Sequence, residues 1–141
     1  MTFTASKADD FTEINNIYRA LQNLVYDKLF YELNETEEDL QFFQKVIEQD
    51  LVNDETFYLY AGMGFALAKL IMKRKTGFNW AILEDEHGTD LVLRYKKTDF
   101  QIDALNMIGS KIAEGELLDI EYMLTYLLNY FEEHAESLEN S

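Results

Sequence analysis

Residues 80–94 read Trp-Ala-Ile-Leu-Glu-Asp-Glu-His-Gly-Thr-Asp-Leu-Val-Leu-Arg, and this stretch decides the fold class. In its second half the alternating apolar residues Leu91 and Leu93 fall on one face of a predicted strand. The acids and the glycine in the middle are residues that tight turns prefer. The sequence therefore predicts a β-hairpin with strands at about 78–84 and 89–95.

Helical patterns fill most of the rest of the chain. Apolar residues recur at steps of three and four, as on the buried face of a helix. A short third strand is predicted at 100–103, and no proline or Gly/Ser-rich linker marks a domain boundary. We predict one α+β domain over 1–141, helix-rich and packed on an antiparallel sheet of two to three strands. The five predicted helices span about 9–29, 36–51, 54–76, 104–113 and 119–138.

The third predicted helix carries a face of small residues. Ala61, Gly64 and Ala68 follow at steps of three and four, which places them on one side of the helix. A glycine inside a helix costs about 1 kcal/mol relative to alanine, so we expect another element to approach this smooth face closely. Gly77 follows three basic residues and is placed to end the helix in a left-handed conformation.

The chain is strongly acidic, with a formal net charge of −15. The charge is uneven, because residues 112–141 hold eight acids and no base whereas residues 69–111 hold eight bases and six acids. Contact with nucleic acid phosphates needs a positive surface, so the composition argues against nucleic acid binding. An acidic surface either favours solubility or attracts a basic partner, and the sequence leaves both open.

Three further observations concern the compartment of the protein. The chain has no cysteine, which excludes disulfides, zinc–thiolate sites and cysteine nucleophiles. Its amino terminus lacks the apolar core of a secretory signal. The most apolar stretch, 56–72, contains Lys69 and is shorter than the roughly 20 residues that a transmembrane helix needs. We therefore predict a cytoplasmic protein that does not enter a membrane.

Six basic residues are predicted to lie close together although they are separated in sequence. If the third helix leads directly into the hairpin, the end of the second strand returns beside the start of the first. Such a cluster could hold a phosphate, a carboxylate or an acidic helix. The alternative is that each cation has a local role at a helix end or a solvated strand end. The residues are Lys73, Arg74, Lys75, Arg94, Lys96 and Lys97.

Tyr122, Tyr126 and Tyr130 recur at steps of four and form one stripe on the last predicted helix. Tyrosine is favoured at protein interfaces because it offers apolar area and a polar tip. The stripe is therefore a candidate interface with a protein partner or, in a homo-oligomer, with a second copy of the chain. The alternative is that the three rings border the core of the domain itself.

Acids and a histidine gather at the predicted hairpin turn. Asp85, His87 and Asp90 are the residues that could ligate a divalent metal there. Their spacing does not match an EF-hand, and the sequence has no second ligand-rich segment to complete the coordination. We therefore predict a solvated turn, with no metal and no cofactor. Dinucleotide-binding loops and nucleophile motifs are also absent from the sequence, which does not indicate an enzyme.

A series of short motifs follows the small-residue helix. In order, they are Gly77-Phe-Asn-Trp80, Asp85-Glu-His-Gly-Thr-Asp90, Arg94, Met107-Ile-Gly-Ser-Lys111 and Glu114-Gly-Glu116. This order resembles a bacterial family known as a domain of unknown function, over about residues 57–120. The chain departs from that pattern in lacking a proline before Met107 and in having Ile112 where a second basic residue is usual. The resemblance implies a fold but no activity.

The acidic ends of the chain and the lack of catalytic patterns favour a non-catalytic protein-interaction module. One form of such a module is an immunity- or inhibitor-like protein that covers a basic partner. The alternative hypothesis is a small-ligand binding protein or a modest enzyme that holds an anion at the six predicted cations.

Overall fold

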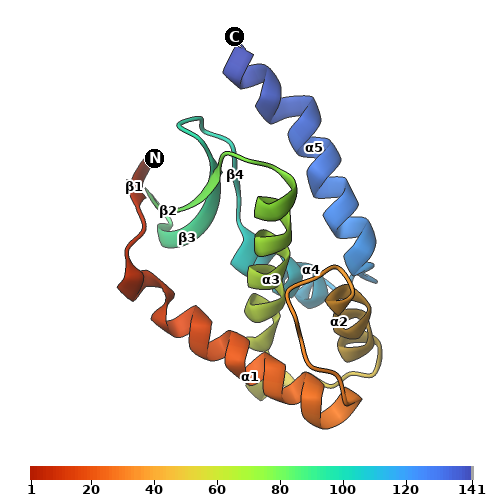
Figure 1. Ribbon diagram of the computed structural model, residues 1–141. Helices are drawn as coiled ribbons and strands as arrows, with labels where there is room; N and C mark the ends of the chain where they lie inside the picture. The colour runs from red at the N-terminus through yellow and green to blue at the C-terminus, as the bar shows by residue number, and fades with distance from the viewer. Residues whose placement is uncertain (141) are drawn as a thin grey trace.

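The structure, a computed structural model, describes the backbone of residues 1–140 and the side chains of residues 1–134. Within these residues, five α-helices and a four-stranded antiparallel sheet form one compact α+β domain (Figure 1). The predicted fold class is confirmed, although the sheet has one strand more than expected. The helices are α1 (Thr12–Leu29), α2 (Asp39–Glu48), α3 (Leu59–Arg74), α4 (Ala104–Ala113) and α5 (Ile120–Asn140). The strands are β1 (Thr2–Ala5), β2 (Phe78–Asp85), β3 (Gly88–Tyr95) and β4 (Gln101–Ile102).

The hairpin that the sequence predicts forms the middle of the sheet, whose strand order is β1-β2-β3-β4. Asp85 lies opposite Gly88, so only Glu86 and His87 form the turn between β2 and β3. Gly88 has a φ of +127°, a conformation that glycine adopts without strain. The two-residue turn therefore fixes the register of the hairpin.

The sequence prediction lacks β1, an outer strand of the sheet. It pairs antiparallel with β2, with Thr2 opposite Glu84 and Ala5 opposite Ala81. Three of its four side chains are exposed, so no alternation of apolar and polar residues marks the segment. Pairing with β2, and not its own sequence pattern, makes it a strand.

α3 lies at the centre of the domain and packs against α1, α4 and β2 (Figure 1). Most of its side chains are buried, as expected for a helix covered on several sides. The close approach predicted for its small face occurs at Gly64, where a β-carbon would lie 1.9 Å from the carbonyl oxygen of Ala104 in α4. Within residues 1–140, none of the helices combines the length and the apolar run that crossing a bilayer requires.

α2 begins at Asp39, three residues later than predicted. The Asp39 carboxylate accepts hydrogen bonds from the backbone N–H groups of Asn34 and Glu35, at 3.1 and 2.8 Å. These bonds fold the chain before α2 into a turn, which competes with helix in this segment.

α3 also begins later than predicted, at Leu59. Asn53 and Thr56 are joined by two hydrogen bonds, one from each backbone N–H group to the other side chain, at 2.9 and 3.0 Å. This capping closes a separate 3-10 helix, Asp54–Thr56, in front of α3. Another 3-10 helix, Ala8–Phe11, precedes α1.

Candidate functional site

Three of the predicted anion-binding residues lie at the end of α3, and each contacts an acceptor of the same domain. Lys73 donates a hydrogen bond from Nζ to the carbonyl oxygen of Glu35 at 2.6 Å. Arg74 forms an ion pair with Glu37, and this hydrogen bond raises the pKa of Arg74. Lys75 forms an ion pair at 2.5 Å with a glutamate of α5. Acceptors within the chain thus compensate much of the positive charge at the helix end.

Arg94 closes the turn between β3 and β4. Its Nε donates to the carbonyl oxygen of Thr98 at 2.8 Å, and its second guanidinium nitrogen donates to that of Lys97 at 3.0 Å. The guanidinium also lies 3.9 Å from the ring centroid of Phe3 in β1. These contacts give Arg94 a structural role between two parts of the sheet.

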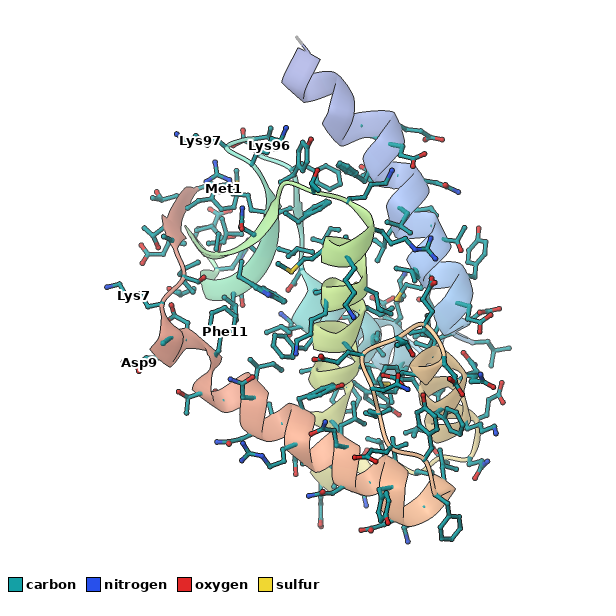
Figure 2. All side chains as sticks on the ribbon, viewed as in Figure 1. Met1, Lys7, Asp9, Phe11, Lys96 and Lys97 are labelled. Atoms are coloured by element: carbon teal, nitrogen blue, oxygen red, sulfur yellow. The ribbon has the colours of Figure 1, made fainter. Side chains whose placement is uncertain are left out.

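Lys96 and Lys97 lie together at the outer end of this turn (Figure 2). The backbone N–H group of Lys96 donates to the carbonyl oxygen of Gly77 at 2.8 Å, so the predicted return of the chain to the start of β2 occurs. The side chains of Lys73 and Arg74 instead reach the segment before α2. The backbone of Lys96 therefore returns to the start of β2 as predicted, whereas the side chains of Lys73, Arg74, Lys75 and Arg94 contact different partners within the chain.

A buried acid that the sequence analysis did not single out organises the segment before α2. Asp39 is 1% exposed, and its carboxylate accepts a hydrogen bond from the Tyr31 hydroxyl at 2.7 Å, beside those from two backbone N–H groups. Buried carboxylates are rare unless such donors surround them. The sequence could have indicated this burial, because Asp39 lies on the same helical face as the apolar residues Phe43 and Val46.

The same segment meets α3 through an ion pair. Glu35 accepts a hydrogen bond from Nζ of Lys69 at 2.5 Å, and this bond lowers the pKa of Glu35. The Lys69 ammonium also lies 5.1 Å from the ring centroid of Tyr18 in α1. Burial raises the pKa of Tyr18 to about 12, and its hydroxyl has no hydrogen-bond partner among the described residues.

The strand register separates the acids of the hairpin turn. Asp85 accepts a hydrogen bond from the backbone N–H group of His87 at 2.9 Å, and the His87 side chain is 82% exposed. Asp90 instead lies near Asp103, whose pKa is raised by burial and by the Asp90 charge. Among the described side chains, no group of three or more His, Asp or Glu residues is placed to hold a metal ion.

The tyrosine stripe lies on the outer face of α5. Tyr122, Tyr126 and Tyr130 are 67%, 53% and 42% exposed, although Phe131 on the other face is buried in the core. The rings of Tyr126 and Tyr130 lie 6.1 Å apart, and that of Tyr130 stacks on His134 at 4.1 Å. The three tyrosine rings are therefore outside the core, and the rings of Tyr126, Tyr130 and His134 adjoin one another.

Two adjoining hollows lie between α4, α5 and the segments that flank α4, and together they form what we call the α4–α5 groove. One has a volume of about 400 Å³ and reaches from β4 to Tyr130. The other has a volume of about 610 Å³ and reaches from Leu117 to Tyr122. Tyr126 lines both hollows and so stands at the middle of the groove. The remaining apolar lining residues are Phe100, Ile102, Met107, Leu118, Met123 and Leu127.

The charged residues of the α4–α5 groove are mainly acidic. Asp103, Glu116 and Asp119 line it, and Lys111 is the one base among its lining residues. Lys111 pairs with Glu116 at 3.5 Å, which compensates its charge. The groove thus combines an apolar floor with a negative rim.

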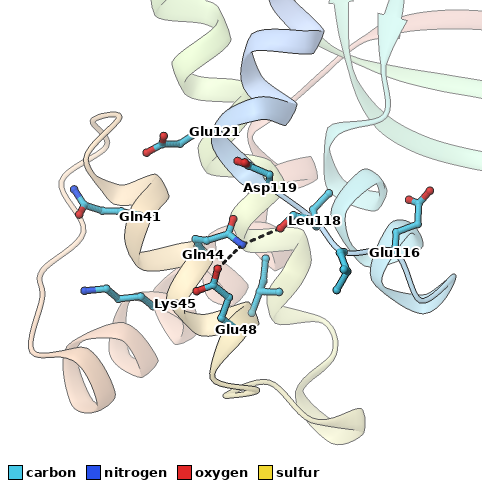
Figure 3. A pocket seen from close by; sticks show the side chains of 10 residues that line it. Gln41, Gln44, Lys45, Glu48, Glu116, Leu118, Asp119 and Glu121 are labelled. Atoms are coloured by element: carbon cyan, nitrogen blue, oxygen red, sulfur yellow. Dashed lines mark hydrogen bonds between the residues drawn. The ribbon is translucent and has the colours of Figure 1, made fainter.

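A third hollow, of about 860 Å³, lies between α2 and the connection from α4 to α5 (Figure 3). The Gln44 side chain crosses it: Nε2 donates to the carbonyl oxygen of Leu118 at 2.8 Å, and Oε1 accepts from the backbone N–H group of Ile120 at 2.9 Å. Gln44 thereby fixes the start of α5. Leu117, fully exposed, lines both this hollow and the α4–α5 groove.

A protein-family model described as Domain of unknown function (DUF3806) matches residues 39–123, more than half of the chain. The chain belongs to the DUF3806 family. The resemblance seen in the sequence is confirmed at the level of the family. The DUF3806 match runs from the start of α2 to the first turn of α5, so it includes one wall of the α4–α5 groove and Tyr122, but ends before Tyr126.

None of the curated proteins matches this DUF3806 chain. A crystal structure of a protein from Bacteroides thetaiotaomicron VPI-5482 is similar, with a TM-score of 0.79 and 20% sequence identity. The similarity covers 92% of this chain and 47% of that one, so the chain spans about half the length of that protein. At this identity the likeness shows the fold alone.

Proposed function

We propose that the chain is a non-catalytic protein-interaction module that binds a basic protein partner through the tyrosine stripe. The observation that carries the proposal is the exposed stripe beside an apolar groove in the most acidic part of the chain. Contiguous exposed apolar surface marks interaction sites, and aromatic residues are enriched in them. An immunity- or inhibitor-like protein is one type of module with this property.

The acidic rim indicates the charge of the partner. Charges across an interface are arranged to be complementary, and like charges brought together weaken a complex. Residues 112–141 hold eight acids and no base, so a partner surface rich in Lys and Arg fits the stripe best. The competing proposal, an anion bound by the six predicted cations, is less well supported because Lys73, Arg74 and Lys75 already contact acceptors of the chain.

The test is to isolate a partner and measure its affinity. The immobilised chain is exposed to a lysate of the source cell at low salt, and bound protein is eluted by raising the salt. The recovered protein is then purified, and its dissociation constant is measured at several salt concentrations. We expect a basic protein whose affinity falls as salt rises, because screening weakens attraction between opposite charges.

Two variants locate the contact. Tyr126→Glu should weaken the complex by about thirtyfold, a typical loss for an aromatic residue at the centre of an interface. Tyr26→Glu is the matched control, because Tyr26 is 61% exposed on α1, outside the stripe. Failure to retain any partner, or equal affinity of the two variants, would overturn the proposed function.

A further inference from the structure

We infer that the part of the partner that occupies the α4–α5 groove is a basic amphipathic α-helix. The inference rests on the proposed function and names the occupant of the same surface. The groove has the length that a short helix requires: at about 1.5 Å per residue, α4 is about 15 Å long and the stripe from Tyr122 to Tyr130 spans about 12 Å. A partner helix of about three turns matches this length.

The backbone hydrogen bonding of the groove favours a helix over an extended peptide. A peptide that binds as a strand needs a sheet edge with unpaired N–H and C=O groups. The sheet edge at the groove is β4, which has only two residues, Gln101 and Ile102. α4 and α5 supply most of the other walls, and a helix pairs its interior backbone groups internally. A helix satisfies its own backbone and needs only side-chain contacts from these walls.

The spacing of the residues that line the groove determines where the partner helix needs apolar side chains. The tyrosines at steps of four form a ridge along α5, and such ridges pack into the grooves between the side chains of a neighbouring helix. Tyr126 divides the two hollows, with Met107 on one side and Met123 on the other. Apolar side chains of the partner at positions i, i+4 and i+7 would enter the hollows on the two sides of Tyr126.

The charges around the groove set the polar face of the partner helix. Asp103, Glu116 and Asp119 line the groove, and Lys111 is paired with Glu116. Lys and Arg on the flanks of the partner helix would compensate these acids. A second copy of the chain would bring its own acidic α5 against this rim, so like-charge repulsion makes it a poor occupant.

The experiment selects the occupant without presupposing its sequence. A displayed library of peptides of about 14 residues, about one helical turn longer than the groove, with randomised apolar and charged positions is selected against the full chain. Binders that also bind Tyr126→Glu are removed. We expect the remaining peptides to have a net positive charge and apolar residues at i, i+4 and i+7. A synthetic peptide of the recovered sequence should become helical on binding, as measured by circular dichroism.

Matched variants assign the peptide to the groove. Binding of the synthetic peptide should fall at least about tenfold with Tyr126→Glu and remain within about twofold with Tyr26→Glu. Ser110→Trp gives an independent check, because Ser110 is exposed on α4, lines the groove, and would fill it when enlarged. That variant should weaken binding by a similar factor although the sequence of α5 is unchanged.

Several results would overturn the inference. These are recovery of no peptide, recovery of neutral or acidic peptides, binding that protects the Gln101 amide as an added strand would, and a chain that dimerises through Tyr126. The proposed function is judged separately by the purified natural partner. If that partner depends on Tyr126 and binds by a loop or strand, the function stands and the helix is excluded. If basic helical peptides bind and no natural partner does, the groove accepts a basic helix, but the proposed function fails and the inference about the natural partner fails with it.

Discussion

Two neighbouring regions of this domain use their side chains in opposite ways. In the segment before α2, polar groups find partners within the chain: Asp39 accepts donors from Tyr31 and the backbone, and Glu35 pairs with Lys69. In the α4–α5 groove, apolar groups lie uncovered, and Tyr126 is 53% exposed at its middle. A dense group of charges is therefore a weak sign of a binding site when the chain itself supplies the counter-charges.

The largest effect is expected from a change that moves a wall of the groove. In Gly64→Ala the new β-carbon would meet the carbonyl oxygen of Ala104, so α4 must shift away from α3. The free energy of unfolding should fall by about 3 kcal/mol or more, as measured by urea denaturation. Gly62→Ala is the matched control, because its β-carbon would meet only side-chain atoms, of Leu21 at 3.2 Å and of Ile17 at 3.4 Å. Similar losses in both variants would contradict the tight contact between α3 and α4.

The next largest effect tests the internally satisfied region. Asp39→Ala would leave the Tyr31 hydroxyl and two backbone N–H groups without their acceptor. We expect a loss of about 2 to 3 kcal/mol in the free energy of unfolding. Asp27→Ala, an exposed acid on α1, should change it by less than about 0.5 kcal/mol. Peptide binding to the groove by folded Asp39→Ala should be unchanged, and a loss of binding would show that the two regions are coupled.

A smaller effect is expected where the groove is tied to α2. Gln44→Ala removes the hydrogen bonds to Leu118 and Ile120, at a cost of about 1 to 2 kcal/mol. Amide hydrogen exchange at residues 118–120 should accelerate more than exchange elsewhere in α5. Gln41→Ala, an exposed glutamine on the same helix, is the control and should leave exchange unchanged. Equal exchange rates at residues 118–120 in the two variants would show that Gln44 does not stabilise the start of α5 beside the groove.

The ion pair between Glu35 and Lys69 predicts a small dependence of stability on pH. Because the hydrogen bond lowers the pKa of Glu35 below its ordinary value of 4.5, the pair stabilises the fold fully above that pH. This stabilisation is lost as the pH falls through the lower pKa of the folded state. Glu35→Gln should cost about 0.5 kcal/mol at neutral pH, since both groups are partly exposed. The difference from the wild type should vanish in acid, and a constant difference would assign the cost to another cause.

The smallest effect is expected at Tyr18. Its buried hydroxyl has no hydrogen-bond partner among the described residues, so Tyr18→Phe removes a group that burial penalises. The free energy of unfolding should stay within about 0.5 kcal/mol of the wild type or rise. A clear loss of stability would show that the hydroxyl has a partner, such as a buried water molecule.

Local patterns predicted the elements that have a strong signal of their own. The turn residues at 85–88 and the small face around Gly64 indicated the hairpin and a close helix contact, and both occur. The pattern did not indicate β1, because its residues become a strand only through pairing with β2, which is more than 70 positions away in the chain. The steps of four among the tyrosines indicated the stripe, but not the groove beside it.

The sequence by itself determined the fold class, the acidic charge and the shared helical face of the three tyrosines, because each depends on composition or on short periodic spacing. Only the tertiary structure decided which charges are compensated and which apolar side chains stay uncovered. Glu35 reaches Lys69 and Glu37 reaches Arg74 across more than 30 residues of chain. The α4–α5 groove likewise needs β4, α4 and α5 together. Such partners are set by packing in space, and no local pattern of residues records them.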